Sequence, residues 1–127
     1  MRIAIDTNLY RDFFSADSEV QKQLRVPELI YVPFVTLAEL RAGFLCGSRG
    51  RENEHRLEQF LSTPRVRTLH QTDRTSRFYA QLYYQLRSLG TPIPTNDLWI
   101  ASLVMENDIY LYSGDQHFDC LPQLPRF

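Results

Sequence analysis

Short apolar segments alternate with longer helical segments along the whole chain, and this alternation limits the fold more than any other feature. Helices of ten or more residues between short strands require crossover connections, and these join parallel strands. Strands of this kind are buried on both faces by the connecting helices. The sequence therefore predicts an α/β fold in three layers, with a central, mainly parallel, twisted sheet and helices on both faces.

Apolar periodicity and the turn residues place the individual elements. The expected strands are residues 3–5, 29–32, 66–69 and 109–112, with a closing edge strand at residues 124–127. The expected helices are residues 9–14, 18–25, 34–46, 51–61, 74–89 and 96–106. A chain of 127 residues buries one sizeable core, so residues 1–127 are expected to form a single domain.

Composition excludes several classes of protein. Hydrophobic residues make up 43% and charged residues 23% of the chain, which argues against disorder and low complexity. No segment approaches the roughly 20 apolar residues of a membrane span, and Asp6 interrupts the first apolar segment, so neither secretion nor membrane insertion is expected. Cys46 and Cys120 lack metal-ligand spacing, so a disulfide framework or zinc site is not expected and a reducing cytoplasm fits.

Basic charge is concentrated in the middle of the chain. Thirteen of the fourteen basic residues are arginine, and nine of these lie in residues 41–87 beside four acids, which gives this segment a charge of +5. The rest of the chain then carries −6. Arginine binds phosphate through a bidentate fork, so a phosphate-bearing partner fits this distribution. Solvated helix faces explain it equally well, and both interpretations stay open.

Two acidic residues directly follow expected strands. Asp6 comes after residues 3–5, and Asp115 follows residues 109–112 after a short turn. Ligands of open parallel sheets bind beyond the carboxyl ends of the strands, so both acids are candidate functional residues. The alternative for Asp6 is a helix N-cap, and the alternative for Asp115 is turn chemistry after Gly114.

Glu39 and Asp97 lie on expected helices. Glu39 is the only charged residue among residues 34–40, and its helical neighbours include the small Ala42 and Gly43. An ionised carboxylate on such a face would cost several kcal/mol, so Glu39 requires a partner. Asp97 lies in the first turn of its helix, where the helix dipole alone is a sufficient explanation.

The four acids together indicate a metal site. Two like charges about 4 Å apart repel by about 4 kcal/mol at an effective dielectric near 20, so four converging carboxylates require cations. Oxygen ligands select hard ions such as Mg²⁺ or Mn²⁺, and a set without His or Cys disfavours zinc.

Four segments around these acids form a recognisable series: Ile5-Asp6-Thr7-Asn8, Val35-Thr36-Leu37-Ala38-Glu39-Leu40, Thr95-Asn96-Asp97-Leu98-Trp99-Ile100-Ala101 and Ser113-Gly114-Asp115-Gln116-His117-Phe118. In this order and spacing they resemble the four acidic motifs of PIN-domain ribonucleases. More narrowly, they are similar to the VapC-type toxins of bacterial and archaeal toxin–antitoxin pairs. The resemblance covers nearly the whole chain and implies a PIN-like fold.

The resemblance assigns roles to the matching residues. It implies that all four acids are catalytic and metal-binding. Asp6 and Asp97 are then the principal ligands, Glu39 joins them directly or through water, and Asp115 is the fourth acid, which more often acts indirectly. It implies that three polar residues orient these carboxylates through hydrogen bonds, namely Thr7, Asn8 and Ser113. Many relatives carry threonine where this chain has Ser113, and the hydroxyl is retained. His117 and Phe118 are interpreted as packing and loop-shaping residues.

The resemblance further implies a Mg²⁺-dependent endoribonuclease, with Mn²⁺ as an alternative ion, acting as the toxin of a type II toxin–antitoxin system. RNA is then the substrate, and a cognate antitoxin, a homodimer and a cytoplasmic location follow. Arg41, Arg49 and Arg51 are candidates for contact with the RNA backbone, with solvated charge around a helix end as the alternative.

Three other functions have requirements that can be compared with this chain. An enzyme with an aspartyl-phosphate intermediate, of the haloacid dehalogenase type, needs a second acid where this chain has Asn8. A phospho-accepting receiver domain needs a late lysine, and Lys22 is the only lysine. A non-catalytic PIN-fold module that binds RNA or protein stays open, although it leaves the four acids unexplained.

Overall fold

All the strands run parallel in a single sheet of order β3-β2-β1-β4. The structure is a computed structural model that describes residues 1–127. In chain order, the strands are β1 (Arg2–Ile5), β2 (Leu29–Pro33), β3 (Val66–Leu69) and β4 (Tyr110–Tyr112). In the centre of the sheet, Ile3 of β1 pairs with Ile30 on one side and Tyr110 on the other. The predicted parallel sheet is confirmed.

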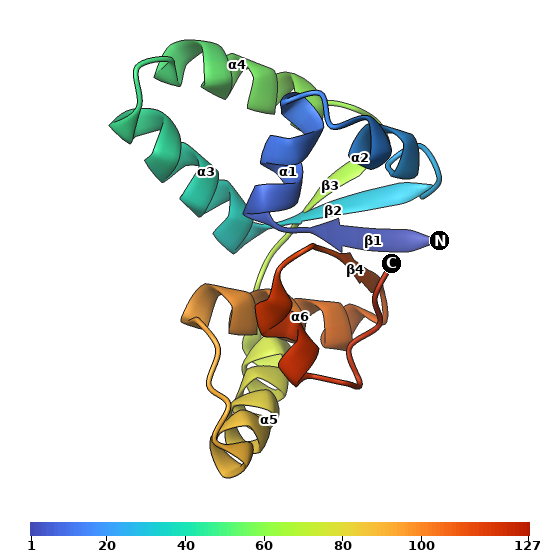
Figure 1. Cartoon of the computed structure of the whole chain (residues 1–127), viewed down its shortest axis with the longest axis vertical. Helices are drawn as coiled ribbons and strands as arrows, with labels where there is room; N and C mark the ends of the chain where they lie inside the picture. The colour runs from blue at the N-terminus through green and yellow to red at the C-terminus, as the bar shows by residue number, and fades with distance from the viewer.

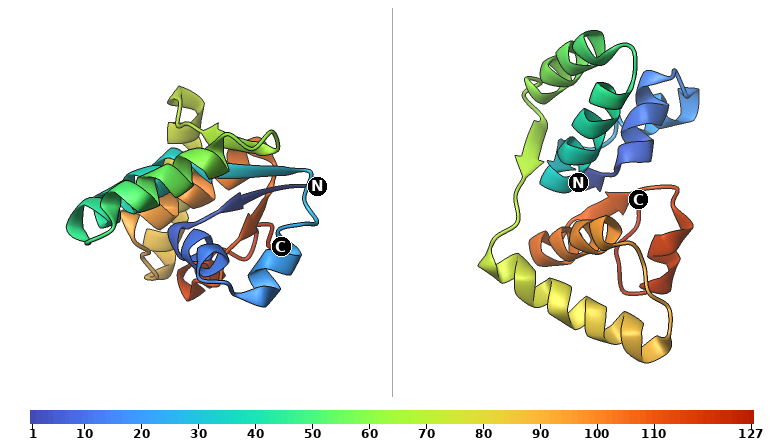
Figure 2. Two further views of the ribbon diagram at one scale, coloured as in Figure 1. Left: turned by 90° about the horizontal axis from the view of Figure 1, so that it is seen from above. Right: turned by 90° about the vertical axis from the view of Figure 1, so that its left-hand side faces the viewer.

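Helices cover both faces of the sheet (Figures 1 and 2). One face carries α1 (Thr7–Phe14), α2 (Ser18–Gln23), α3 (Phe34–Cys46) and α4 (Gly50–Leu61). The other face carries α5 (Asp73–Leu89), α6 (Thr95–Asn107) and the 3₁₀ helix η1 (Gln116–Cys120). This arrangement confirms the three predicted layers. None of the helices combines the length and apolar character needed to cross a membrane.

Each face of the sheet has its own hydrophobic core. Side chains alternate along a strand, so Ile3 and Ile5 of β1 join the core under α1 to α4, whereas Ala4 joins the core under α5 and α6. All three side chains are fully buried. Continuous apolar strands such as β1 are typical of a sheet covered on both faces.

The C-terminal segment differs from the prediction. An edge strand was expected at residues 124–127, but the structure has only an isolated parallel bridge between Arg126 and Leu111. Leu124 is buried in the core beneath it. Leu111 N donates to Pro125 O at 2.8 Å and Phe127 N donates to Leu111 O at 2.9 Å, and Pro125 has no N–H for a further hydrogen bond to the strand.

The carboxyl edge of the sheet brings distant segments together. β1 ends immediately before Asp6 and α1, β2 ends immediately before α3, and β4 ends immediately before Ser113. Parallel strands necessarily deliver these three chain segments to the same edge. The candidate site is built there.

Candidate functional site

A cavity of about 640 Å³ lies at the carboxyl edge of the sheet. Twelve residues line it, and only one of them is hydrophobic. The lining includes all four acids singled out in the sequence, which are Asp6, Glu39, Asp97 and Asp115. Residues from the beginning, middle and end of the chain therefore share one polar cavity.

Asp6 is both a helix cap and a cavity residue. Its side chain is buried, and Oδ1 accepts a hydrogen bond from Leu9 N at 2.9 Å at the start of α1. Oδ2 accepts a hydrogen bond from the Ser113 hydroxyl. Burial raises the pKa of Asp6, with the negative charges of Asp115 and Glu39 acting in the same direction, while these two hydrogen bonds oppose the rise. The N-cap explanation therefore applies to Asp6, and the same side chain also lines the cavity.

Glu39 projects from the middle of α3, and its partner is a hydroxyl group. Thr7 Oγ1 donates a hydrogen bond to Glu39 Oε1 at 2.9 Å. No arginine or lysine forms an ion pair with Glu39. The partner expected for Glu39 is thus the neutral Thr7 hydroxyl. No positively charged side chain is paired with the Glu39 carboxylate.

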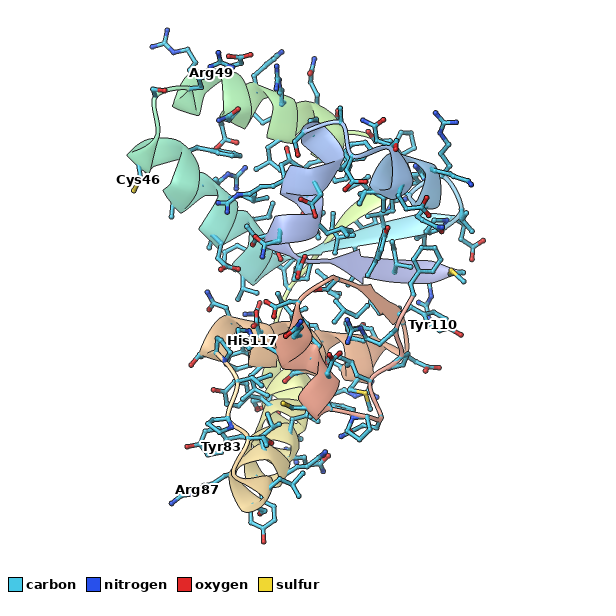
Figure 3. All side chains as sticks on the ribbon, in the orientation of Figure 1. Cys46, Arg49, Tyr83, Arg87, Tyr110 and His117 are labelled. Atoms are coloured by element: carbon cyan, nitrogen blue, oxygen red, sulfur yellow. The ribbon has the colours of Figure 1, made fainter.

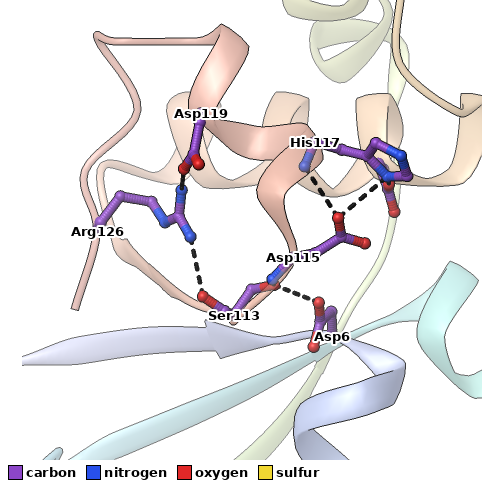
Figure 4. A network of polar contacts seen from close by, with 7 residues as sticks. Asp6, Ser113, Asp115, His117, Asp119 and Arg126 are labelled. Carbon is purple, nitrogen blue, oxygen red and sulfur yellow. Dashed lines mark hydrogen bonds and ion pairs between the residues drawn. The ribbon is translucent and has the colours of Figure 1, made fainter.

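Asp97 and Asp115 both contact His117, and Figure 4 shows the Asp115 side chain directed toward the His117 ring. His117 Nδ1 lies 2.9 Å from Asp97 Oδ2 and 3.1 Å from Asp115 Oδ1. The ligand atoms of these three residues all lie within 4.8 Å of one another. Burial raises the pKa of Asp97, and the nearby charges of Asp115 and Asp6 add to the rise. The hydrogen bond to Asp97 raises the pKa of His117.

The expected orienting residues differ in their contacts. Thr7 bonds to Glu39, as described above. Ser113 donates to Asp6 and accepts a hydrogen bond from Asp115 N at 3.0 Å, so one hydroxyl joins two acidic segments. Asn8 lines the cavity with an exposed side chain that forms no hydrogen bond in the protein. The role of Asn8 stays a prediction.

The sequence interpretation missed two ionisable residues of the cavity lining. His117 was interpreted as a packing residue, and this was wrong because its ring is half exposed and contacts two carboxylates. Phe118, by contrast, is fully buried, which confirms its packing role. Arg11 also lines the cavity. Its spacing of four residues from Thr7 on one helix face was the signal available for it.

The three arginines expected to contact RNA lie elsewhere. Arg41 Nε forms an ion pair with Glu54 Oε1 at 2.9 Å. Arg49 and Arg51 line a separate depression at the start of α4. Figure 3 shows Arg49 past the C-terminal end of α3, on the part of the molecule away from His117. None of the three lines the acidic cavity. Their contact with RNA stays a prediction.

The donor atoms of the cavity suit a hard divalent cation. Four carboxylate groups line the cavity and offer the oxygen ligands that Mg²⁺ and Mn²⁺ prefer. The expected set without histidine is corrected by the structure, because His117 lies with Asp97 and Asp115 in one cluster of ligand atoms. The pKa values of Asp6 and Asp97 are raised by burial and by their neighbours, so a cation would relieve an unfavourable concentration of negative charge. The residues present therefore fit such an ion.

Comparison with known proteins identifies the family. The family model described as "PIN domain" matches residues 3–123. The chain belongs to the PIN domain family. Among curated proteins, this PIN domain is 31% identical to Ribonuclease VapC5 of Mycobacterium tuberculosis over 96 residues, which cover 76% of the chain and 71% of the relative. It is 30% identical to Ribonuclease VapC4 of the same organism over 93 residues, covering 73% and 72%. The predicted VapC resemblance is confirmed.

Solved structures show the same fold. VapBC2 from Rickettsia felis, bound to a DNA fragment from its promoter, matches with a TM-score of 0.90 and 24% identity, covering 100% of this PIN domain and 98% of that chain. VapBC-5 from Mycobacterium tuberculosis, a member of the VapBC family of toxin–antitoxin systems, matches with a TM-score of 0.74 and 27% identity, covering 98% and 93%.

Proposed function

We propose that this PIN domain, formed by residues 1–127, is the endoribonuclease toxin of a type II toxin–antitoxin pair and hydrolyses RNA phosphodiester bonds with Mg²⁺. Mn²⁺ is the alternative ion. The observation that carries the proposal is the gathering of Asp6, Glu39, Asp97 and Asp115 in one polar cavity. The names of the curated relatives, each a ribonuclease of the VapC group, support the same reaction.

In this proposal Asp6 and Asp97 hold the metal, while Glu39 and Asp115 complete the site directly or through water. When bound, the ion supplies a water of lowered pKa and positive charge for the phosphoryl oxygens. Thr7 and Ser113 keep Glu39 and Asp6 in place through the hydrogen bonds described above. Asn8 is proposed to join them in this orienting role.

Water is the proposed nucleophile. The cavity lining contains no cysteine or serine, and its two hydroxyl residues are Thr7, whose hydroxyl is donated to Glu39, and Thr95, the first residue of α6, for which no activating base is seen. Glu39 Oε2 forms no hydrogen bond in the protein, so it is free to accept a proton from an attacking water. Hydrolysis then needs no covalent enzyme intermediate.

The proposed partners are RNA, a cognate antitoxin and a second copy of the chain. Structural neighbours solved as VapBC pairs support the antitoxin. The homodimer follows from the family resemblance alone, and an RNA substrate implies action in the cytoplasm. Arg41, Arg49 and Arg51 remain proposed contacts for the RNA backbone outside the cavity.

A non-catalytic binding module is the alternative function. It is less well supported, because the raised pKa values of Asp6 and Asp97 reflect an electrostatic strain that a pure binding surface does not need. The relatives named as ribonucleases also favour an enzyme.

The proposed function is tested by mapping cleavage sites on total cellular RNA. Parent protein is expected to cut with Mg²⁺ and to stop when EDTA is added, and Asp6→Asn is expected to abolish cleavage. Asp17→Asn is a matched control, because Asp17 also caps a helix, α2, but lies outside the cavity. Cleavage that survives EDTA, or an Asp6→Asn protein that cuts as fast as the parent, would refute the assignment.

A further inference from the structure

Arg11 is the only arginine or lysine that lines the acidic cavity. It lies on α1, one turn after Thr7. Although four carboxylates line the same cavity, the Arg11 side chain forms no ion pair and no hydrogen bond with any of them. Its charge is therefore available to a ligand.

The neighbouring helix leaves space for this guanidinium group. Gly43 lies one turn after Glu39 on α3, and a Cβ atom built at Gly43 would be 3.0 Å from Arg11 Nη2. Real Cβ contacts are rarely this short, so a larger residue at this position would shift the end of the flexible Arg11 side chain by a few tenths of an ångström. Glycine is unfavourable inside a helix, and its presence here is explained by the close approach of Arg11.

The chemistry of the cavity selects a phosphate as the ligand of Arg11. A guanidinium group binds phosphate oxygens through two parallel N–H donors. An RNA phosphate offers the oxygen pair that this fork fits, and it would be drawn to cations held by the four carboxylates. We propose that Arg11 binds a phosphate group of the RNA substrate inside the catalytic cavity, and that Gly43 gives the guanidinium group the space to do so. This role of Arg11 rests on the proposed ribonuclease function.

Steady-state cleavage of an RNA oligonucleotide tests the residue itself. Arg11→Ala is expected to lower kcat/KM by about 100-fold, the usual scale for one charge-stabilising donor in an active site. Arg11→Lys keeps the charge without the fork, so a smaller loss of about tenfold is expected. Arg25→Ala is the control, because Arg25 is exposed, forms no ion pair and precedes β2 at the opposite edge of the sheet. A parental kcat/KM for Arg11→Ala would overturn the proposal.

A double-mutant cycle tests the role of Gly43. Gly43→Ala favours the helix, so unfolding would not explain a loss of activity. A several-fold loss of kcat/KM is expected from Gly43→Ala in the parent, and no further loss in the Arg11→Ala background. Equal losses in both backgrounds would show that Gly43 acts independently of Arg11.

Binding of the same single-stranded oligonucleotide, with Ca²⁺ in place of Mg²⁺, gives a readout that does not need catalysis. Arg11→Ala is expected to weaken binding and to reduce the slope of log affinity against log salt by about 0.7, the change for one phosphate contact on a single strand. An unchanged slope would overturn the proposal. If the parent binds RNA but cuts none, the ribonuclease function fails while this measurement still decides the role of Arg11.

Discussion

Thr7 Oγ1 donates a hydrogen bond to Glu39 Oε1 at 2.9 Å, and this contact joins the first residue of α1 to the middle of α3. The two helices begin beside the carboxyl ends of β1 and β2, which are neighbours in the sheet. The hydrogen bond therefore fixes the orientation of Glu39 relative to Asp6, which directly precedes Thr7.

Removal of this hydroxyl is expected to weaken the metal site. Thr7→Val preserves the shape of a buried side chain but cannot donate to Glu39, so a loss of about 10- to 100-fold in Mg²⁺ affinity or cleavage rate is expected. Isothermal titration and cleavage assays measure the two effects. Thr7→Ser is the control and should keep most of the activity. Parental affinity and rate in Thr7→Val would show that Glu39 needs no orienting donor.

Replacement of Asp6 is expected to stabilise the metal-free protein. Since burial raises the pKa of Asp6 in the folded state, the native protein loses stability as the pH rises from the ordinary pKa of 3.8 through the folded pKa. An asparagine at this position cannot ionise, and its amide oxygen can still cap α1. Urea unfolding in EDTA at neutral pH should therefore show a higher free energy of unfolding for Asp6→Asn than for the parent. An equal or lower value would contradict the electrostatic account.

With Mg²⁺ bound, the parent should be more stable than Asp6→Asn, which is the reverse of the order expected in EDTA. At a Mg²⁺ concentration of about 100 times Kd, the parent gains about 2.7 kcal/mol, whereas Asp6→Asn and Asp97→Asn should gain little. Thermal unfolding with and without Mg²⁺ measures the gain. Asp17→Asn should respond to Mg²⁺ as the parent does, since Asp17 lies outside the cavity. A full Mg²⁺ response in Asp6→Asn would exclude Asp6 as a ligand.

Because the Tyr10 side chain is buried, the free energy of unfolding is expected to depend on pH in the alkaline range. Burial of the ring among Phe14 and Phe60 raises the pKa of Tyr10 from 10.0 to about 12. Its contribution to stability is complete below about pH 10 and is lost as the pH rises toward about 12, because the unfolded chain releases the proton first. Tyr10→Phe should therefore show a shallower fall in the free energy of unfolding across this pH range. Identical pH profiles would contradict the assignment.

Arg41 has a structural partner that must be separated from any contact with RNA. Glu54 Oε2 is buried without a hydrogen bond, so loss of the Arg41 ion pair at Oε1 leaves this carboxylate with no partner. Arg41→Ala is expected to lower the free energy of unfolding by about 1 kcal/mol. Urea unfolding of Arg41→Ala, Glu54→Gln and the double variant measures the coupling. Weaker RNA binding in a variant of unchanged stability would favour a direct contact instead.

Much of the architecture was predictable because it depends on local patterns. Buried strands such as β1 and β2 are short apolar runs, and turn residues such as Gly90 mark where helices end. Parallel connectivity then places the residues that follow β1 and β4 at one edge of the sheet. The sequence therefore predicts that Asp6 and Asp115 lie at the same edge of the sheet, although the two residues are far apart in the chain.

The acids and their shared edge were determined by the sequence alone, since strand periodicity and connection length are properties of the chain itself. Only the tertiary structure decided that His117 joins Asp97 to Asp115, that Arg11 lies unpaired over Gly43, and that Arg41 binds Glu54. These contacts depend on how far one packed helix lies from another and on the direction of each side chain. Residues 124–127 form only a single bridge to β4 for a different, local reason, because Pro125 has no backbone N–H for a further hydrogen bond in the ladder.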